Sequence, residues 1–329
     1  MEAQLRATGR LEVRRIGDNV IARTGLGRPR RLLLAGHLDT VPANGNARSR
    51  LEGETLWGLG SADMKGGLAV MLDLAEAVTT PAVDVTWVFY VAEEVAREHN
   101  GLLQIEAADP SLLHADAAVL GEPTGAMIEA GCQGVLKAEV TLGGARAHTA
   151  RPWMGTNALH RMGPVLDLLA SGWERRPVID GCRYREAVQA VRAEAGVATN
   201  VVPDRATLVL NHRFAPDRDE AGAEAQLRGW IGPLLSPELG DSLTVVDSSP
   251  AAPPNLTHPL LDALLRSTGA EPRAKLGWTD VAFFTERDIP AVNFGPGDPE
   301  LAHTADERVT AADLDRARAC LRAILTAGA

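Results

Sequence analysis

The chain has 329 residues, of which 43 are Asp or Glu and 33 are Lys or Arg, so its net charge is −10. This length allows two domains with a sizeable core, and the acidic balance disfavours nucleic acid and anionic membrane as partners. No apolar stretch approaches the length of a membrane span, and the N-terminus lacks the apolar segment of a signal peptide. The three cysteines are odd in number and widely spaced, which argues against a disulfide framework. We therefore expect a cytoplasmic protein.

The first part of the chain shows strand and helix patterns in turn. Residues 11–24 are predicted to form a strand, and residues 66–77 carry apolar side chains at helical spacing directly after Asp63. That spacing places the Asp63 carboxylate in a loop at a helix start. Residues 101–107 are predicted to form a short helix.

Three apolar runs end in polar residues, the pattern of buried parallel strands that run out into loops. The run at residues 30–40 carries His37 near its end. The run at 85–95 carries a Glu pair near its end, and the run at 114–125 carries Glu122. In open α/β sheets, ligands collect at the carboxyl ends of the strands. The pattern therefore predicts one shared crevice in an α/β domain with a mixed, largely parallel sheet flanked by helices.

The pattern changes from residue 137 onward. The predicted order is strand, helix, strand, strand, helix, strand, over residues 137–142, 152–170, 186–194, 205–214, 219–235 and 242–248. This β-α-β-β-α-β order is the ferredoxin-like unit and predicts a small inserted α+β domain. Helices are then expected at residues 258–268 and 311–326. We place the discontinuous first domain at residues 1–134 and 249–329 and the inserted domain at 135–248.

Two imidazoles and three carboxylates have the chemistry of a metal centre. Such a set suits a pair of zinc ions if one carboxylate bridges the metals and a water remains between them. A core histidine or a solvated glutamate explains any single member equally well, but several buried carboxylates without a cation would carry a large desolvation cost. The candidate ligands are His37, Asp63, Glu94, Glu122 and His303.

The motifs around these residues resemble a known family. GHLDTVP, WGLGSADMKGG, the Glu pair, GEPTG and GPGDPELAHTADE are similar to those of the co-catalytic zinc aminoacylases and peptidases, which include succinyl-diaminopimelate desuccinylases, acetylornithine deacetylases and carboxypeptidase G. Longer stretches at 129–160, 180–192, 210–218 and 275–284 look most like the actinobacterial desuccinylases. The resemblance spans residues 11 to 309. It departs at the N-terminus, where family members carry an additional helical segment.

The resemblance implies a role for each metal ligand. His37 and Glu122 would complete the first zinc site, and Glu94 and His303 the second. Asp63 would bridge the two ions. Cobalt or manganese can replace zinc, because oxygen and nitrogen ligands tolerate all three metals.

The resemblance also implies catalytic residues. Asp39 would accept the other ring N–H of His37 and hold its tautomer. Glu93 would act as general base, provided that the strand ends there, since strict alternation sends adjacent side chains to opposite faces. In this family the equivalent of His148 reaches the active site of the partner subunit as an oxyanion donor, which implies a homodimer. The alternative for His148 is a surface histidine at a turn.

Substrate contacts are expected from cations and polar groups. Arg213 can grip a carboxylate through two parallel hydrogen bonds, although a cross-strand ion pair is the alternative for this residue. Asn200 and Thr279 resemble polar substrate contacts of the family. Arg183 and Arg185 are further candidates, for which a solvated face is the favoured interpretation.

The resemblance to the actinobacterial desuccinylases implies hydrolysis of N-succinyl-LL-2,6-diaminopimelate. Acetylornithine deacetylases and dipeptide-cleaving relatives would keep all five ligands and differ only in the pocket. A non-catalytic zinc-dependent binder of small acids is a further alternative, but it would have no need of Glu93. The glycine run at 58–67 lacks the GxGxxG spacing of a dinucleotide site, so we discard a nucleotide enzyme.

Overall fold

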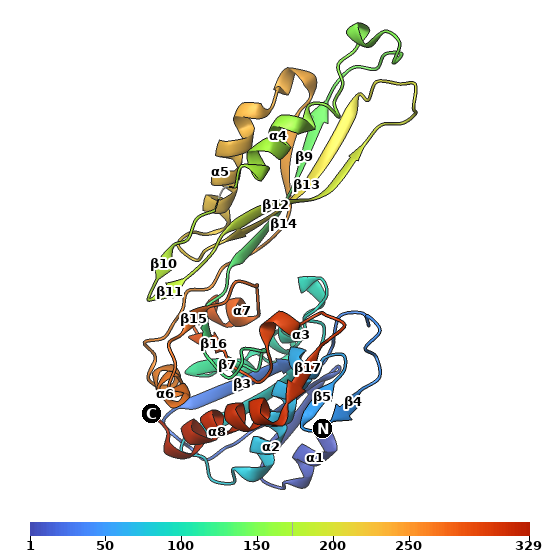
Figure 1. The fold of residues 1–329 in the computed structure, drawn as a ribbon. Helices are drawn as coiled ribbons and strands as arrows, with labels where there is room; N and C mark the ends of the chain where they lie inside the picture. The colour runs from blue at the N-terminus through green and yellow to red at the C-terminus, as the bar shows by residue number, and fades with distance from the viewer. Residues whose placement is uncertain (173) are drawn as a thin grey trace. The chain divides into compact units, whose positions relative to one another are not determined.

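The computed structural model describes residues 1–172 and 174–329. The chain divides into two compact units (Figure 1). The second unit comprises Cys132–Pro253 and Leu276–Trp278, close to the expected 135–248 but with a short additional segment. The first unit is assembled from Met1–Gly131, Pro254–Lys275 and Thr279–Ala329.

The helices and strands of the described residues are as follows. The α-helices are α1 (Glu2–Ala7), α2 (Gly66–Ala77), α3 (Gly101–Ala108), α4 (Met162–Ala170), α5 (Glu220–Ile231), α6 (Pro259–Thr268), α7 (Val281–Thr285) and α8 (Ala311–Ala327). The strands are β1 (Glu12–Ile16), β2 (Asn19–Arg23), β3 (Arg31–His37), β4 (Arg50–Glu52), β5 (Thr55–Trp57), β6 (Asp84–Tyr90), β7 (Ala117–Leu120), β8 (Glu129–Ala130), β9 (Gly134–Gly143), β10 (Val178–Ile179), β11 (Cys182–Arg183), β12 (Ala187–Ala195), β13 (Arg205–Phe214), β14 (Ser242–Ser249), β15 (Arg273–Ala274), β16 (Ala291–Asn293) and β17 (Arg308–Thr310). Within this part of the chain, no helix is both long and apolar enough to cross a membrane.

The large sheet of the first unit is mixed and largely parallel, as predicted. Its strand order is β1-β2-β6-β3-β7-β16-β8-β15, with β3 between β6 and β7 and parallel to both. Every residue of β6 and β7 is buried, which is why these strands read as continuous apolar runs and not as alternating ones. The carboxyl ends of the three central strands therefore lie at one edge of the sheet.

Close backbone packing brings helix α2 against that edge. A Cβ atom on Gly67 would lie 2.1 Å from the backbone oxygen of Gly121, so only glycine allows this approach. Gly121 follows β7 directly and donates its N–H to Ala35 of β3 at 2.9 Å. The turn Ser61–Lys65, which precedes α2 and carries Asp63, is thereby held beside the strand ends.

The second unit has the predicted ferredoxin-like topology. Its sheet order is β12-β13-β9-β14, and all neighbours are antiparallel. Burial alternates along β9 and β13, so one face of the sheet packs in a core that includes residues of α4 and α5. Figure 1 shows the two helices on the same side of the strands.

Three predicted elements were wrong in extent. Residues 11–24 form a hairpin of β1 and β2, because Gly17 adopts a left-handed φ of 57° at the turn. Only Met162–Ala170 of the predicted helix 152–170 is α-helical, since Pro152 and Gly155 favour a short 3-10 turn over a continuous helix. Helix α5 ends at Ile231, before a Gly-Pro pair that continues as a 3-10 turn.

Candidate metal centre

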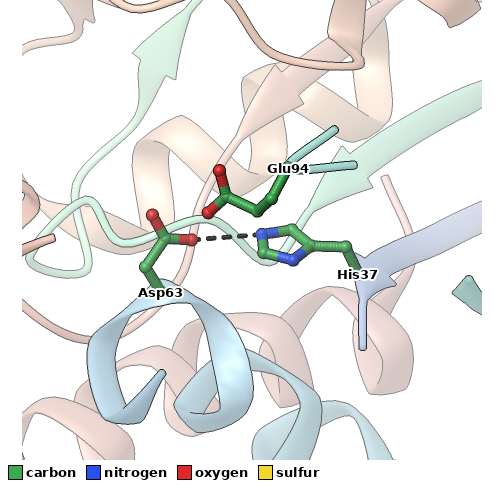
Figure 2. A group of neighbouring side chains, drawn as sticks. All are labelled: His37, Asp63 and Glu94. Carbon is green, nitrogen blue, oxygen red and sulfur yellow. Dashed lines mark hydrogen bonds and ion pairs between the residues drawn. The ribbon is translucent and has the colours of Figure 1, made fainter. Parts of the chain in front are cut away.

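Three of the predicted ligands lie within ion-binding range of one another. His37, Asp63 and Glu94 each offer a ligand atom, and these atoms all lie within 4.8 Å of each other. Figure 2 shows the imidazole of His37 facing the Asp63 carboxylate, with 3.1 Å between Nε2 and Oδ1. His37 is the last residue of β3, Asp63 precedes α2, and Glu94 follows β6. His37 and Glu94 therefore lie where their strands end, and Asp63 reaches them from the turn before α2.

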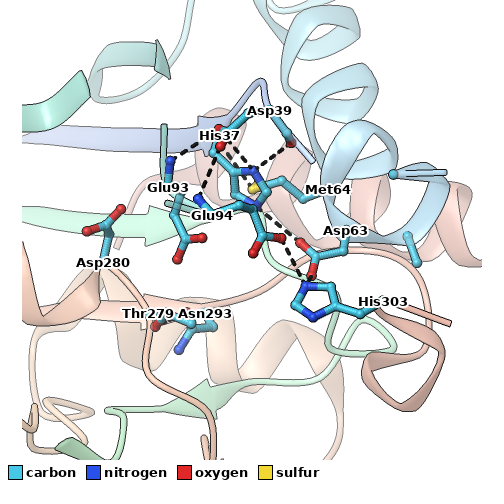
Figure 3. A network of polar contacts seen from close by, with 12 residues as sticks. His37, Asp39, Asp63, Met64, Glu93, Glu94, Thr279, Asp280, Asn293 and His303 are labelled. Atoms are coloured by element: carbon cyan, nitrogen blue, oxygen red, sulfur yellow. Dashed lines mark hydrogen bonds and ion pairs between the residues drawn. The ribbon is translucent and has the colours of Figure 1, made fainter. Parts of the chain in front are cut away.

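His303 joins this group from the C-terminal part of the first unit. Its Nε2 lies 2.9 Å from Oε1 of Glu94 and 3.3 Å from Oδ2 of Asp63 (Figure 3). One carboxylate oxygen of Asp63 therefore faces His37 while the other faces His303. That is the geometry needed for a carboxylate that bridges two ions.

Burial makes the remaining carboxylates difficult to ionise. Glu122 is buried, and burial, reinforced by the charge of Asp63, raises its pKa to about 7. Its Oε1 is buried without a hydrogen-bond partner among the described residues. Burial and the charge of Glu122 also raise the pKa of Glu93 well above its usual value. A divalent cation would relieve these costs, so the donor set fits a metal centre although Glu122 lies outside the tight cluster.

The two imidazoles hold protons that a metal would have to displace. Burial lowers the pKa of His37, but its hydrogen bond to Asp63 and the charges of Glu122 and Glu93 outweigh that effect and raise the pKa to about 10. The hydrogen bond to Asp63 likewise raises the pKa of His303 to about 9. Only neutral imidazole binds a metal, so metal binding is coupled to proton release.

Asp39 contacts its neighbours differently from the expectation. The ring Nδ1 of His37 lies 3.1 Å from the backbone oxygen of Asp39 and 3.7 Å from its carboxylate. The carboxylate instead accepts the backbone N–H groups of Glu93 at 3.2 Å and Glu94 at 3.1 Å. These amides lie beyond the end of β6, where Ala92 has a left-handed φ of 63°, so they need a partner outside the sheet. Asp39 therefore anchors the segment that carries the Glu pair.

Sequence reasoning missed Glu307, which holds the loop of Asp63. Its side chain is buried, and its carboxylate accepts the N–H groups of Gly60 at 2.8 Å, Ala62 at 3.1 Å and Asp63 at 2.9 Å. Its only sequence signal is an acidic residue four positions after His303, which does not identify a partner. Glu307 links the segments that supply two of the ligands.

A second missed residue, Asp280, lies beside Glu93 (Figure 3). It is buried and accepts the hydroxyl of Tyr90 and the amide N–H of Asn100, each at 2.8 Å. Its charge contributes to the raised pKa of Glu93. Its neighbour Thr279, a predicted substrate contact, is also buried and donates its hydroxyl to Asn293, which lies 2.9 Å away.

Two of the other predicted residues, His148 and Asn200, belong to the second unit and lie close together there. His148 is exposed and forms an isolated β-bridge with Val201, while its Nδ1 accepts the N–H of Ala150 at 3.0 Å. Asn200 is also exposed, and its backbone oxygen accepts the N–H of Thr149 at 3.1 Å.

The arginines of the second unit differ in their contacts. Arg213 on β13 is half-buried, and its Nε donates to Asn211 at 3.2 Å. The ion pairs found in residues 1–172 and 174–329 do not include Arg213. Arg185 is exposed and pairs with Glu174, whereas Arg183 is exposed on β11.

Comparison with known proteins identifies the family. Residues 33–327 match peptidase family M20/M25/M40. The chain belongs to peptidase family M20/M25/M40. It is 48% identical over 330 residues, 99% of this chain and 91% of the relative, to a protein of Mycobacterium tuberculosis assigned as a succinyl-diaminopimelate desuccinylase, DapE. It is 43% identical to the succinyl-diaminopimelate desuccinylase of Corynebacterium glutamicum, over 96% of this chain and 86% of that one. This M20/M25/M40 protein is a metal-dependent amidohydrolase.

Solved structures of the family share the fold. A tripeptidase from Staphylococcus aureus matches with a TM-score of 0.77 at 20% identity, covering 99% of this chain and 90% of that one. A Bacillus subtilis protein described as a dinuclear metal binding peptidase matches with a TM-score of 0.67 at 18% identity, covering 97% and 88%. The arrangement of a large mixed sheet with an inserted α+β unit is therefore that of the M20/M25/M40 family.

Proposed function

We propose that the protein hydrolyses N-succinyl-LL-2,6-diaminopimelate to succinate and LL-2,6-diaminopimelate, a step of diaminopimelate and lysine biosynthesis in the cytoplasm. The observation that carries the reaction class is the position of Asp63 between His37 and His303, with Glu94 beside them. The substrate assignment is supported by the names of the relatives that are 48% and 43% identical over nearly the whole chain.

We propose a pair of zinc ions as the cofactor. Asp63 would bridge them, His37 and Glu122 would complete one site, and Glu94 and His303 the other. The unpartnered Oε1 of Glu122 and the proximity of Glu94 to His303 support this division. When bound, a zinc pair supplies Lewis acidity, which polarises the amide carbonyl and lowers the pKa of water from about 15.7 towards 7.

Glu93 carries the proton in the proposed mechanism. Its carboxylate takes a proton from the attacking water as the water oxygen bonds to the amide carbon. Glu93 then returns this proton to the leaving amine nitrogen as the C–N bond breaks. Asp39 fixes the backbone at Glu93 through the 3.2 Å hydrogen bond, so the base stays in place during both transfers.

Arg213, Asn200 and Thr279 are the proposed substrate contacts. The half-buried guanidinium of Arg213 is available for a substrate carboxylate, because its Nε contact is with a neutral amide. Asn200 would offer its side-chain amide, and Thr279 its hydroxyl.

A panel of substrates tests the assignment. We expect the zinc-loaded protein to hydrolyse N-succinyl-LL-2,6-diaminopimelate with a kcat/KM at least about a hundredfold above those for N-acetylornithine and simple dipeptides. The reason is that unpaired site cations reject substrates that lack the matching carboxylates. Release of succinate and of free amine is measured for each compound. Activity confined to N-acetylornithine or to dipeptides would refute the succinyl assignment and leave the hydrolase class intact.

We further propose a homodimer in which the second unit serves as the dimerisation and lid domain. His148 would supply an oxyanion donor to the active site of the partner subunit, as in the family that the chain resembles. A His148→Ala protein is expected to lose about a hundredfold in kcat, as removal of an oxyanion donor does elsewhere. Mixing His148→Ala with Glu93→Gln protein should restore activity, because one mixed site receives both intact residues. Full turnover by His148→Ala alone would contradict this role.

A further inference from the structure

Lys275 differs in burial from the other two lysines of the chain. Lys65 and Lys137 are exposed, whereas the side chain of Lys275 is only 12% exposed. Its Nζ lies 3.0 Å from Oε2 of Glu129, whose side chain is 11% exposed. Burial of an ammonium group is costly, and a buried ion pair is often no more stabilising than an apolar pair of similar size. Stability alone is thus a weak reason for a lysine at this position.

The ion pair lies close to the segment that carries Glu122. Asn293, the last residue of β16, is paired in register with Leu120 of β7 on one side and with Glu129 of β8 on the other. Glu122 comes two residues after Leu120. Neighbouring strands are about 4.8 Å apart, so Glu129 lies about 10 Å from Leu120 across β16. Lys275 directly follows β15, the strand next to β8, so both members of the pair belong to the part of the sheet beside the proposed metal centre.

The charge of Lys275 reaches the proposed metal centre. Burial lowers the pKa of Lys275, but the charges of Glu129, Glu122 and Asp63 outweigh burial and raise it. Lys275 is therefore an ammonium at neutral pH, and two of the carboxylates that act on it belong to proposed ligands. Ligation of a metal would engage both of these carboxylates, so neither would then serve as a full counter-charge for the ammonium.

The ammonium has more donors than Glu129 can use. Lysine carries three N–H groups, and the ion pair involves a single oxygen of Glu129. A nearly buried donor needs an acceptor, and a carboxylate is the strongest partner for an ammonium. The proposed substrate has a carboxylate on each side of the scissile amide. One is separated from the amide carbonyl by two methylene groups, and the other is on the carbon that bears the amide nitrogen.

We propose that Lys275 binds one of these two substrate carboxylates, while Glu129 orients the ammonium. The inference rests on the proposed function and adds a specificity-determining residue to it. A substrate without this carboxylate would leave the ammonium without its second partner and would therefore bind poorly.

Binding of the two reaction products to metal-loaded protein tests this role. Calorimetry measures the affinities of succinate and of LL-2,6-diaminopimelate for wild type and for Lys275→Met. We expect one product to lose about thirtyfold in affinity, because a charge-assisted hydrogen bond is removed, and the other to change less than about threefold. A loss for succinate assigns Lys275 to the acyl carboxylate, and a loss for diaminopimelate assigns it to the carboxylate on the amine side.

Three further variants separate binding from a structural role. Glu129→Gln keeps the ammonium and removes its counter-charge, so it should bind the same product at least as tightly as wild type. The double variant Glu129→Gln/Lys275→Met contains neither charge of the pair and should show the selective loss relative to Glu129→Gln. Lys137→Met makes the same replacement at an exposed lysine, which pairs with Asp247, and should leave both affinities unchanged.

Several results would overturn the proposal. They are wild-type affinity of Lys275→Met for both products, equal loss for both products, equal losses in Glu129→Gln and Lys275→Met, and a wild-type protein that binds neither product. Hydrolysis of the succinyl substrate is measured on the same samples. Wild-type turnover without a selective loss in Lys275→Met refutes the role of Lys275 alone, whereas absence of wild-type turnover refutes the proposed function.

Discussion

Glu93→Gln protein is expected to lose about a thousandfold in kcat, within the range for removal of a general base. The amide has the size of the carboxylate but cannot accept a proton from water. This factor corresponds to about 4 kcal/mol of transition-state stabilisation. Initial rates with the succinyl substrate at saturating concentration measure the effect. Because Glu93 is not among our proposed ligands, the metal content of the variant should equal that of the wild type.

Two controls make this prediction specific. Glu98→Gln changes an exposed carboxylate on the same segment and should leave kcat unchanged. The affinity for the product succinate should be similar in Glu93→Gln and wild type, since the base acts on water and not on the acyl group. Full turnover by Glu93→Gln would remove the base role. Loss of metal in that variant would instead make Glu93 a ligand.

The overall affinity for the two ions, the product of their binding constants, is expected to fall at least about a hundredfold between pH 7 and pH 6. His37, with a pKa of about 10, and His303, with a pKa of about 9, are both protonated in this window when metal is absent. Each must become neutral to bind an ion, and each released proton lowers the apparent affinity about tenfold per pH unit. Glu122, with a pKa of about 7, becomes protonated as the pH falls from 7 to 6, and this proton must also be released when metal binds. Raised pKa values therefore weaken metal binding as the pH falls.

Chelator competition at several pH values measures this slope, and calorimetry in buffers of different ionisation enthalpy counts the released protons. His99→Asn should retain the slope, because His99 is exposed and lies outside the cluster. Glu122→Gln should make the slope shallower below pH 7. An overall slope of fewer than two protons for the pair of ions would show that the two imidazoles are not both ligands.

Local patterns in the sequence were sufficient for much of the fold. The buried runs predicted β3, β6 and β7 as parallel strands, and helical spacing predicted α2 with its observed bounds, Gly66–Ala77. Both patterns are repeats of apolar residues along a short stretch of sequence, so they can be recognised without knowledge of distant segments. The errors at 11–24 and 152–170 occurred where glycine or proline interrupts the pattern, because a single residue there decides whether the chain turns or continues.

For the candidate site, the residue types were visible in the motifs but their contacts were not. His37, Asp63, Glu94 and His303 were named from the sequence, and the structure brings them together. The carboxylate of Asp39 was expected on His37 and instead binds two backbone amides. Such a choice depends on which unpaired amides lie nearby, and the sequence does not specify their position.

The sequence by itself determined which side chains end the central strands and that an inserted β-α-β-β-α-β unit interrupts the first domain. Only the tertiary structure decided that Glu307 supports the loop of Asp63 across 244 positions, that Asp280 lies beside Glu93, and that His303 reaches Glu94 across 209 positions. Periodicity encodes the burial of a residue relative to its neighbours, whereas hydrogen bonds between distant segments and the pKa values of enclosed groups depend on how those segments pack.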